Sequence, residues 1–381
     1  MDFDFNEEQQ LLADSVRKYL GNTYSFEARK AIIGSASGSS ADAWRTFADM
    51  GLTAIPFSEE DGGLGGGAVD LMASMEAFGE SLVVEPVLDN IALAGRAVAG
   101  AGSAAQRATV LPGLMDGSTK LALAYLEPGR RYALDAASTV AAPHSTERGA
   151  WVLNGKKIMV VGAPLADTLV VSARTANGTS LFLVDGKAAG VTVTAYRTVD
   201  GQRAGDVQFA NVRLGAEALL GSEGQALPAI EEALDFATAL LCCDAVGAMK
   251  SANDATLDYL KTRKQFGSVI GSFQALQHRM VDMFIACEQA RSMATLAVSQ
   301  VDAAAHSRDA ATVAERKAVV SSAFICVADA ARQVSQESVQ LHGGMGMTEE
   351  LKVSHTFRRL TVLSQRFGDV DHHLARYAAL T

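Results

Sequence analysis

The 381-residue sequence has few cysteines, few prolines and no excess of basic side chains, and each shortage excludes a class of protein. Its four cysteines, at positions 242, 243, 287 and 326, show no CxxC spacing and no histidine at metal-ligand spacing. We therefore expect buried free thiols and no metal site. With only 7 prolines and 49 % hydrophobic residues, the chain should fold around a large core. A formal net charge of −10, with scattered basic residues, argues against a nucleic-acid partner.

Long apolar runs are also missing. No stretch reaches the roughly 18 uninterrupted apolar residues that a membrane span needs. The first residues are acidic and carry no apolar signal segment. We expect a cytoplasmic protein that has no membrane partner.

The spacing of apolar residues divides the chain into three segments. Residues 1–119 show helical spacing, interrupted by the glycine-rich stretch 56–67. Residues 120–221 alternate with a period of two, which predicts a β-domain, and Asn154-Gly155 is a hairpin-turn signal inside it. Residues 222–381 return to helical spacing. The predicted helices are 7–19, 40–50, 67–78, 89–99, 104–115, one from 222, 273–304, 310–341 and 349–363; the strands are 121–127, 151–161, 168–172, 181–185, 191–196 and 207–214.

A glycine-rich run from Gln340 through Gly343, Gly344 and Gly346 follows the third long helix of the last segment. Glycine can adopt φ > 0, and its backbone lets N–H groups approach an anion closely. By itself this run also fits a plain helix end and turn. Upstream, Arg263 offers a fork of donors to a phosphate, and Gln274 and Gln340 can pair with a purine or ribose edge. Together these residues favour a nucleotide site.

Three stretches carry a family resemblance: RKQFG from Arg263, FQALQH from Phe273, and QLHGGMGMTEE from Gln340. They resemble the C-terminal domain of the acyl-CoA dehydrogenase family. Residues 1–20 and 56–66 are also similar to that family, so the resemblance covers nearly the whole chain. It implies an α+β fold with an N-terminal helical domain (1–119), a middle β-domain of barrel or sandwich type (120–221) and a C-terminal four-helix bundle (222–381).

The resemblance also implies a chemistry. Members of the family remove a proton α to a thioester carbonyl with a carboxylate and transfer the β-hydride to FAD, forming a 2,3-enoyl-CoA. For this chain the resemblance implies FAD as cofactor, an acyl-CoA as substrate and electron-transferring flavoprotein as electron acceptor.

The catalytic carboxylate of the family is missing. Counting along the motif places Phe367 at the usual glutamate position, and the alternative position on the first long C-terminal helix is Ala237. Asp369 and Asp235 each lie two residues from these positions and are candidates for a substitute base. For both, a surface carboxylate is the structural alternative.

The middle segment has lost the residues that the family uses to hold the flavin ring. Leu126 replaces a threonine, Met159 replaces a tryptophan, and Val161 replaces a hydroxyl residue. Met159 and Val161 suit the core of an ordinary strand, and we expect one here.

By contrast, the half-site that a family subunit offers to its neighbour's FAD matches without a gap: Arg263, Gln265, Phe266, Phe273, Gln274, Gln340, Leu341, His342, Gly343 and Gly344. The chain therefore resembles the non-catalytic subunits of heteromeric acyl-CoA dehydrogenases, such as the small subunit of pimeloyl-CoA dehydrogenase and the steroid side-chain type. We expect an α2β2 assembly with a catalytic paralogue. A self-sufficient dehydrogenase with an atypical base and a flavin-free acyl-CoA-binding scaffold are the alternatives. The sequence does not identify the acyl group of the substrate.

Overall fold

A computed structural model describes residues 6–134, 138–305 and 307–380. Contacts within the chain divide it into two compact units. The helical unit contains Met1–Ala31, Ala68–Val83 and Thr238–Thr381, and the sheet unit contains Ile32–Gly67 and Val84–Ala237. The N-terminal helices are thus shared between the two units. The three-segment boundaries at 119/120 and 221/222 stay a prediction.

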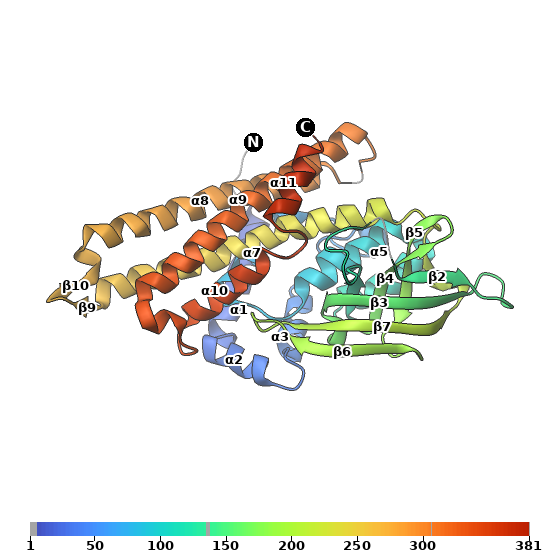
Figure 1. Cartoon of the computed structure of the whole chain (residues 1–381), viewed down its shortest axis with the longest axis horizontal. Coiled ribbons are helices and arrows are strands. Elements are labelled where there is room, and N and C mark those ends of the chain that lie inside the picture. Colours follow the sequence, from blue (N-terminus) through green and yellow to red (C-terminus); the bar gives the residue numbers. More distant parts are fainter. Residues whose placement is uncertain (1–5, 135–137, 306, 381) are drawn as a thin grey trace. The chain divides into compact units, whose positions relative to one another are not determined.

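The helical unit is built on three long helices, of which α8 and α9 pack side by side (Figure 1). Gly79 on α4 and Gly247 on α7 explain how two helices approach so closely. A Cβ on either glycine would lie within 2 Å of a backbone oxygen of the other helix. The predicted long helices are confirmed, whereas α2 and α11 were not expected. The elements are α1 (Glu7–Thr23), α2 (Phe26–Gly34, up to Ala31), α4 (Ala68–Ser81), α7 (Leu227–Thr262, from Thr238 on), α8 (Gln274–Ala303), α9 (Ala310–His342), α10 (Lys352–Leu363) and α11 (Val370–Ala378).

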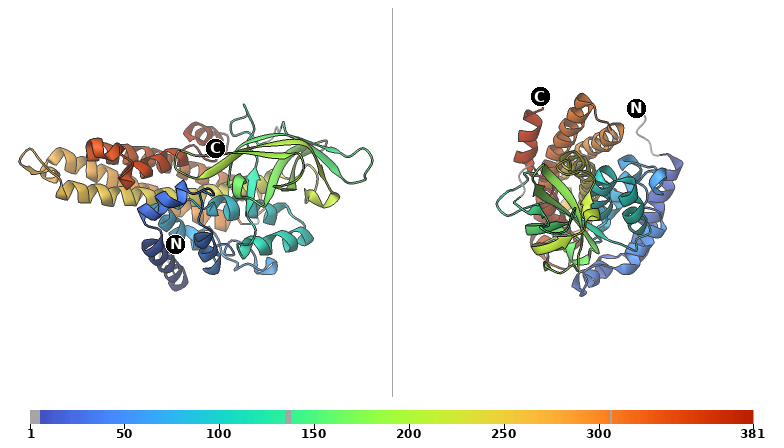
Figure 2. Two further views of the ribbon diagram at one scale, coloured as in Figure 1. Left: turned by 90° about the horizontal axis from the view of Figure 1, so that it is seen from below. Right: turned by 90° about the vertical axis from the view of Figure 1, so that its right-hand side faces the viewer.

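The sheet unit has an eight-stranded mixed sheet in the order β6-β7-β3-β2-β4-β5-β8, with β1 parallel to β4. Figure 2 shows its strands from two further directions. Trp151 and Phe182 meet edge to face in its core, with ring centroids 5.4 Å apart. The strands are β1 (Leu121–Ala124), β2 (Val140–Pro143), β3 (Trp151–Val161), β4 (Thr168–Thr175), β5 (Gly178–Asp185), β6 (Val191–Arg197), β7 (Arg203–Leu214) and β8 (Leu219–Leu220). The helices are α3 (Ala41–Asp49), α5 (Arg96–Ala101), α6 (Ala104–Met115) and the start of α7.

The hairpin turn predicted at Asn154-Gly155 is wrong. Both residues lie inside the continuous strand β3, where the pairing with β7 shifts register between Leu153 and Gly155. Gly155 has φ 147°, and a Cβ there would lie 2.6 Å from Thr139, so glycine allows a bulge and a close approach of β2. The same dipeptide therefore served a bulge rather than a turn.

Other expectations hold with shifted bounds. α7 begins at Leu227 rather than at 222, and the helix predicted at 89–99 starts as a π-helix, η2 (Leu88–Gly95), before α5. The stretch 56–67 contains a single short helical turn, η1 (Glu59–Asp61). The four cysteines are free: three are buried and Cys326 is half-buried. The α+β class and the order of helices, β-domain and helices are confirmed.

Helix α9 has one property that bears on the membrane prediction. Together with the turn after it, Ala310–Met347, it is long and apolar enough to cross a membrane, but 56 % of its most apolar window is buried inside the fold. Such burial is typical of a core helix.

Candidate functional site

One end of the helical unit brings together the ten residues expected to bind a nucleotide. Here α7 ends, α8 begins and α9 ends, and a small hairpin of β9 (Lys264–Gln265) and β10 (Ser268–Val269) projects (Figure 1). We call this end, with residues 259–274 and 340–349, the bundle tip. The predicted site residues are far apart in sequence, and the antiparallel course of the three helices places them at the same end.

Phe266 and Gly267 form the turn of the hairpin, with φ values of 55° and 77°. Helix α7 ends before this turn, at Thr262. A two-residue turn with both central residues left-handed favours Asn-Gly, so a phenylalanine at its first position is unfavourable. The Phe266 ring is 91 % exposed and touches Phe273 edge to face, with centroids 6.3 Å apart. Neither strain nor exposure serves the fold of the isolated chain, which suggests a role in binding.

The polar side chains of the bundle tip face solvent. Arg263, Gln265, Gln274 and Gln340 are exposed. Within the part of the chain that the structure describes, the Arg263 guanidinium makes no hydrogen bond or ion pair. These donors are available to an external phosphate or nucleotide.

The glycines after α9 have two different roles. Gly343 adopts φ 62°, and a Cβ on Gly343 or Gly344 would meet no atom within 4 Å. Gly346 is buried instead, and a Cβ there would lie only 2.7 Å from the Val339 carbonyl oxygen. Gly343 and Gly344 therefore form an open, anion-accessible turn, whereas Gly346 is a packing residue and not part of the predicted cradle.

Leu341 and His342 support this turn from inside. Both are buried, and the His342 Nδ1–H donates to the Ser338 carbonyl oxygen at 2.8 Å. The His342 ring stacks on Tyr259 of α7, with centroids 4.4 Å apart. Burial lowers the pKa of His342, so the imidazole is neutral. The sequence analysis does not single out Tyr259, although residues four apart lie on the same face of a helix and Tyr259 comes four residues before Arg263.

At the usual base position, Phe367 is half-buried in a left-handed conformation, φ 56°. The Arg366 guanidinium lies 4.7 Å from the centre of its ring. The candidate base Asp369 is the N-cap of α11, where its Oδ1 accepts from the His372 N–H at 2.8 Å. This contact is structural, and no proton acceptor of the expected kind stands at position 367.

The alternative base position is also empty of a carboxylate. Ala237 is completely buried on α7. Asp235 is 1 % exposed, so its interpretation as a surface carboxylate is wrong. Two residues along an α-helix correspond to a rotation of about 200°, so Asp235 does not project from the same helix face as Ala237.

The strand expected around Met159 is present as part of β3, but the expectation that Met159 and Val161 are ordinary core residues of it is wrong. Met159 has φ 53° at a register shift of β3 and is 48 % exposed, and Val161 is half-buried rather than part of the core. The Met159 N–H donates to the Tyr196 hydroxyl at 3.1 Å, and that hydroxyl donates to Asp206 at 3.0 Å. Lys156 pairs with the same carboxylate at 3.0 Å. We call Lys156, Met159, Tyr196 and Asp206 the strand cluster.

Electrostatics confirm that the strand cluster is satisfied internally. Burial and the neighbouring Asp206 carboxylate raise the pKa of Tyr196 to about 12. Its proton is therefore held between two protein groups rather than offered to a ligand. The hydroxyls and the stacking ring that a flavin needs are replaced by groups that bind each other.

Comparison with known proteins places these features in a family. The N-terminal, middle and C-terminal domains of acyl-CoA dehydrogenase match residues 6–118, 122–212 and 224–379. The chain belongs to the acyl-CoA dehydrogenase family. It is 28 % identical to acryloyl-CoA reductase (NADH) of Anaerotignum propionicum, covering 98 % of this chain and 94 % of that protein. It is 29 % identical to acyl-CoA dehydrogenase FadE12 of Mycobacterium tuberculosis, covering 92 % and 89 %.

Solved structures of the family have the same fold. A variant of the Tcur3481-Tcur3483 steroid ACAD is 28 % identical, with a TM-score of 0.85 over 98 % of this chain and 97 % of that one. The ChsE4-ChsE5 complex from Mycobacterium tuberculosis, 24 % identical, shares the fold with a TM-score of 0.88 over 100 % and 98 %. Acyl-CoA dehydrogenases are FAD-dependent oxidoreductases.

The two regions of this acyl-CoA dehydrogenase fit FAD differently. At the bundle tip, exposed Arg263, Gln274 and Gln340 and the open Gly343-Gly344 turn fit the phosphates and the nucleotide end of FAD. The strand cluster does not fit the flavin ring, because its hydroxyl and carboxylate are engaged with each other. The chain is thus equipped to hold one part of the cofactor.

Proposed function

We propose that this chain is the non-catalytic subunit of a heteromeric, FAD-dependent acyl-CoA dehydrogenase, completing FAD sites on a catalytic paralogue in an α2β2 tetramer. The observation that carries the proposal is the contrast between an intact, exposed bundle tip and a base position occupied by Phe367. A phenyl ring cannot accept a proton, so the paralogue supplies the carboxylate. FAD, when bound, supplies the hydride acceptor for the 2,3-desaturation of an acyl-CoA.

The surface of α8 supports an assembly of subunits. Val281, Phe284 and Ile285 are 53 %, 58 % and 47 % exposed on its outer face. A contiguous exposed apolar face of this kind marks a protein–protein interface. With Phe266 and Phe273 near the start of the same helix, it supports a partner subunit that covers both the helix and the bundle tip.

The relatives support a more specific assignment. The similar Tcur3481-Tcur3483 structure is a steroid ACAD named for two components. In line with it, we propose that the acyl-CoA belongs to fatty-acid or steroid breakdown and that electron-transferring flavoprotein accepts the electrons. We also propose that the enzyme is cytoplasmic.

The second candidate is a self-sufficient dehydrogenase with an atypical base, for which Asp235 offers a buried carboxylate, although on another face of α7 than Ala237. Flavin content separates the two functions. The isolated chain should carry little FAD and show no turnover with an artificial acceptor, and co-expression with its catalytic paralogue should yield a yellow, active tetramer. About one FAD per isolated chain, with turnover abolished by Asp235→Asn, would establish the second function. Absence of FAD in every combination would leave a flavin-free acyl-CoA-binding scaffold.

A further inference from the structure

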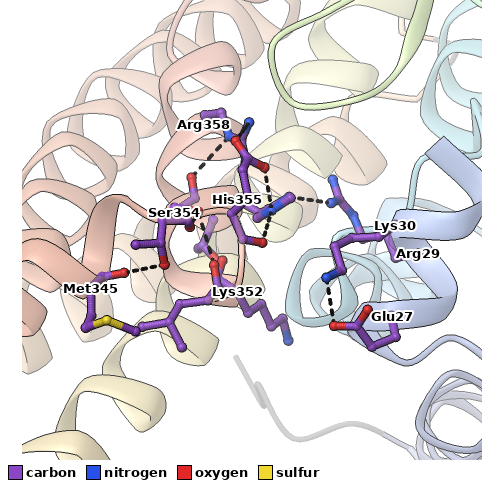
Figure 3. A network of polar contacts seen from close by, with 12 residues as sticks. Glu27, Arg29, Lys30, Met345, Lys352, Ser354, His355 and Arg358 are labelled. Carbon is purple, nitrogen blue, oxygen red and sulfur yellow. Dashed lines mark hydrogen bonds and ion pairs between the residues drawn. The ribbon is translucent and has the colours of Figure 1, made fainter. Parts of the chain in front are cut away.

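The segment that follows the Gly343-Gly344 turn is held by side chains of α10 (Figure 3). Arg358 donates to both oxygens of the Glu349 carboxylate, at 3.0 and 2.9 Å. Ser354 Oγ donates to the Thr348 carbonyl oxygen at 2.6 Å, and Thr348 Oγ1 donates to the Met345 carbonyl oxygen at 2.9 Å. A continuous series of hydrogen bonds therefore runs from α10 to the edge of the turn.

His355 extends this series to α2. Its Nε2 lies 3.3 Å from the Glu349 carbonyl oxygen and 3.2 Å from the Glu349 carboxylate. On the other side, the Arg29 Nη1 lies 3.1 Å from the His355 Nδ1. A guanidinium can only donate, so Nδ1 accepts and the ring proton is on Nε2. The imidazole must be neutral to join Arg29 to Glu349.

Arg29 is a fixed anchor for this ring. It is 1 % exposed, and its Nε donates to the Leu82 carbonyl oxygen at 2.6 Å. The Phe26 and His355 rings meet edge to face, with centroids 4.8 Å apart. His355 is therefore held on two sides by the N-terminal helix α2 and on its third side by the segment after the turn.

We propose that neutral His355 is a positioning residue for the nucleotide half-site: it fixes the segment 345–349 and thereby the Gly343-Gly344 turn. This inference rests on the proposed partner-subunit function. A Cβ on Gly343 or Gly344 would meet no atom within 4 Å, so no side-chain packing fixes the two glycines. The Gly343 N–H donates to the Gln340 carbonyl oxygen on the side of α9, and the segment 345–349 holds the turn on its other side.

The charges around His355 give the proposal a pH dependence. Arg29 and Arg358 are cations beside the ring, and Glu349 is the nearby carboxylate. Two further cations in the same region are Lys30, which pairs with Glu27 at 2.8 Å, and Lys352 (Figure 3). Burial, Arg358 and Arg29 together lower the pKa of His355 below its ordinary value. Protonation would turn Nδ1 into a donor facing the Arg29 donor, and the contact would break.

The test uses the tetramer formed with the catalytic paralogue and measures FAD release between pH 5 and 8. In the parent, release should accelerate as the pH falls from 6.5 through the lowered pKa of His355. His355→Gln should release FAD about tenfold faster at pH 8, the effect of losing a hydrogen bond to a charged group, and should lose most of the pH dependence. Arg29→Met should also release FAD faster. His144→Gln, at a half-buried position, and Arg332→Gln, at an exposed one, are matched controls.

A second measurement needs no flavin. Amide hydrogen exchange of the isolated chain should be faster over residues 343–349 in His355→Gln and unchanged in His144→Gln. Unchanged exchange and an unchanged pH profile in His355→Gln would overturn the role of His355 while leaving the partner-subunit function intact. A parent tetramer without FAD would overturn the partner-subunit function, and with it the purpose assigned to this contact.

Discussion

The bundle tip and the strand cluster both present a large, left-handed, exposed side chain, and they differ in what surrounds it. Phe266 has φ 55° and Met159 has φ 53°. Around Phe266, the donors of Arg263 and the glutamines face solvent. Around Met159, Tyr196 and Asp206 bind each other and the backbone. Solvent-facing donors are typical of a surface kept for a ligand, whereas internally paired groups contribute to the fold of their own chain.

Under the partner-subunit function proposed above, the bundle tip serves a neighbour's FAD, and its residues keep the family pattern because binding requires them. The strand cluster and Phe367 have no such role in that proposal, and they make contacts within the chain, such as the Arg366 guanidinium over the Phe367 ring.

The largest loss of stability is expected when the buried ion pair of Lys157 and Glu127 is broken. Lys157 is fully buried, and its Nζ donates to Glu127 at 2.7 Å and to Ser172 at 2.9 Å. Lys157→Met leaves the buried Glu127 carboxylate without its cation and should lower the free energy of unfolding by about 3 to 5 kcal/mol. Lys156→Met breaks only an exposed pair and should cost at most about 1 kcal/mol. Urea unfolding of both variants checks this, and equal losses would show that the buried pair does not support the sheet.

The ion pair of Lys157 and Glu127 also makes the stability of the fold depend on pH in the acid range. Burial alone would raise the pKa of Glu127, but hydrogen bonds from Lys157, Ser138 and Thr139 outweigh it and lower the pKa to about 2. Because this folded value lies below the unfolded value, the stabilisation is complete above pH 4.5 and is lost as the pH falls through 2. Glu127→Gln should show a smaller loss of melting temperature over that interval. A parallel acid decline in parent and variant would assign the acid sensitivity to other carboxylates.

Features that depend on neighbouring residues could be predicted from the sequence, whereas features that depend on contacts between distant segments could not. β3 and α9 follow from local periodicity, and their observed bounds match the prediction to within one residue. The tip residues carry short motifs, and the antiparallel helices bring them to one end. The left-handed Met159, by contrast, depends on the register between β3 and β7.

The burial of Asp235 and the stacking of Tyr259 on His342 could not be predicted from the sequence either. The burial of Asp235 depends on elements packed around α7, and the stacking of Tyr259 on His342 joins two residues that are 83 positions apart in the sequence. Hydrophobic periodicity records which face of an element is buried, but it does not record which partner covers a given polar group.

The next largest effect is on FAD retention, and it distinguishes the bundle tip from the strand cluster. Arg263→Ala should weaken FAD retention by the tetramer by about 1.5 to 3 kcal/mol, because it removes a charge-assisted contact to a phosphate. Tyr196→Phe removes the hydroxyl of the strand cluster and should leave FAD retention unchanged. Limiting-flavin titration measures both. If Tyr196→Phe lost more FAD than Arg263→Ala, this chain would hold its own flavin ring and the contrast would be reversed.

A smaller effect is expected at the base position. Phe367→Glu supplies a carboxylate but no flavin platform, so the isolated variant should stay inactive toward acyl-CoA. Since Phe367 is only half-buried, its melting temperature should fall modestly, by the equivalent of about 1 kcal/mol. The assay compares the variant alone and with the paralogue. Turnover by the variant alone would mean that the strand cluster opens to accept flavin.

The smallest effect tests the two left-handed residues against each other. Glycine at φ near 55° removes a strain of about 1 to 2 kcal/mol but adds about 0.5 to 1 kcal/mol of unfolded-state entropy. Phe266→Gly and Met159→Gly should therefore both change the stability of the isolated chain by no more than about 1 kcal/mol. Assembly should distinguish them: Phe266→Gly removes a ring that is 91 % exposed and should weaken association with the paralogue, whereas Met159→Gly should not. Sedimentation of each variant with the paralogue measures the difference. Equal association of both would remove the ring of Phe266 from the interface, and the strain at that turn would then need an explanation within the chain itself.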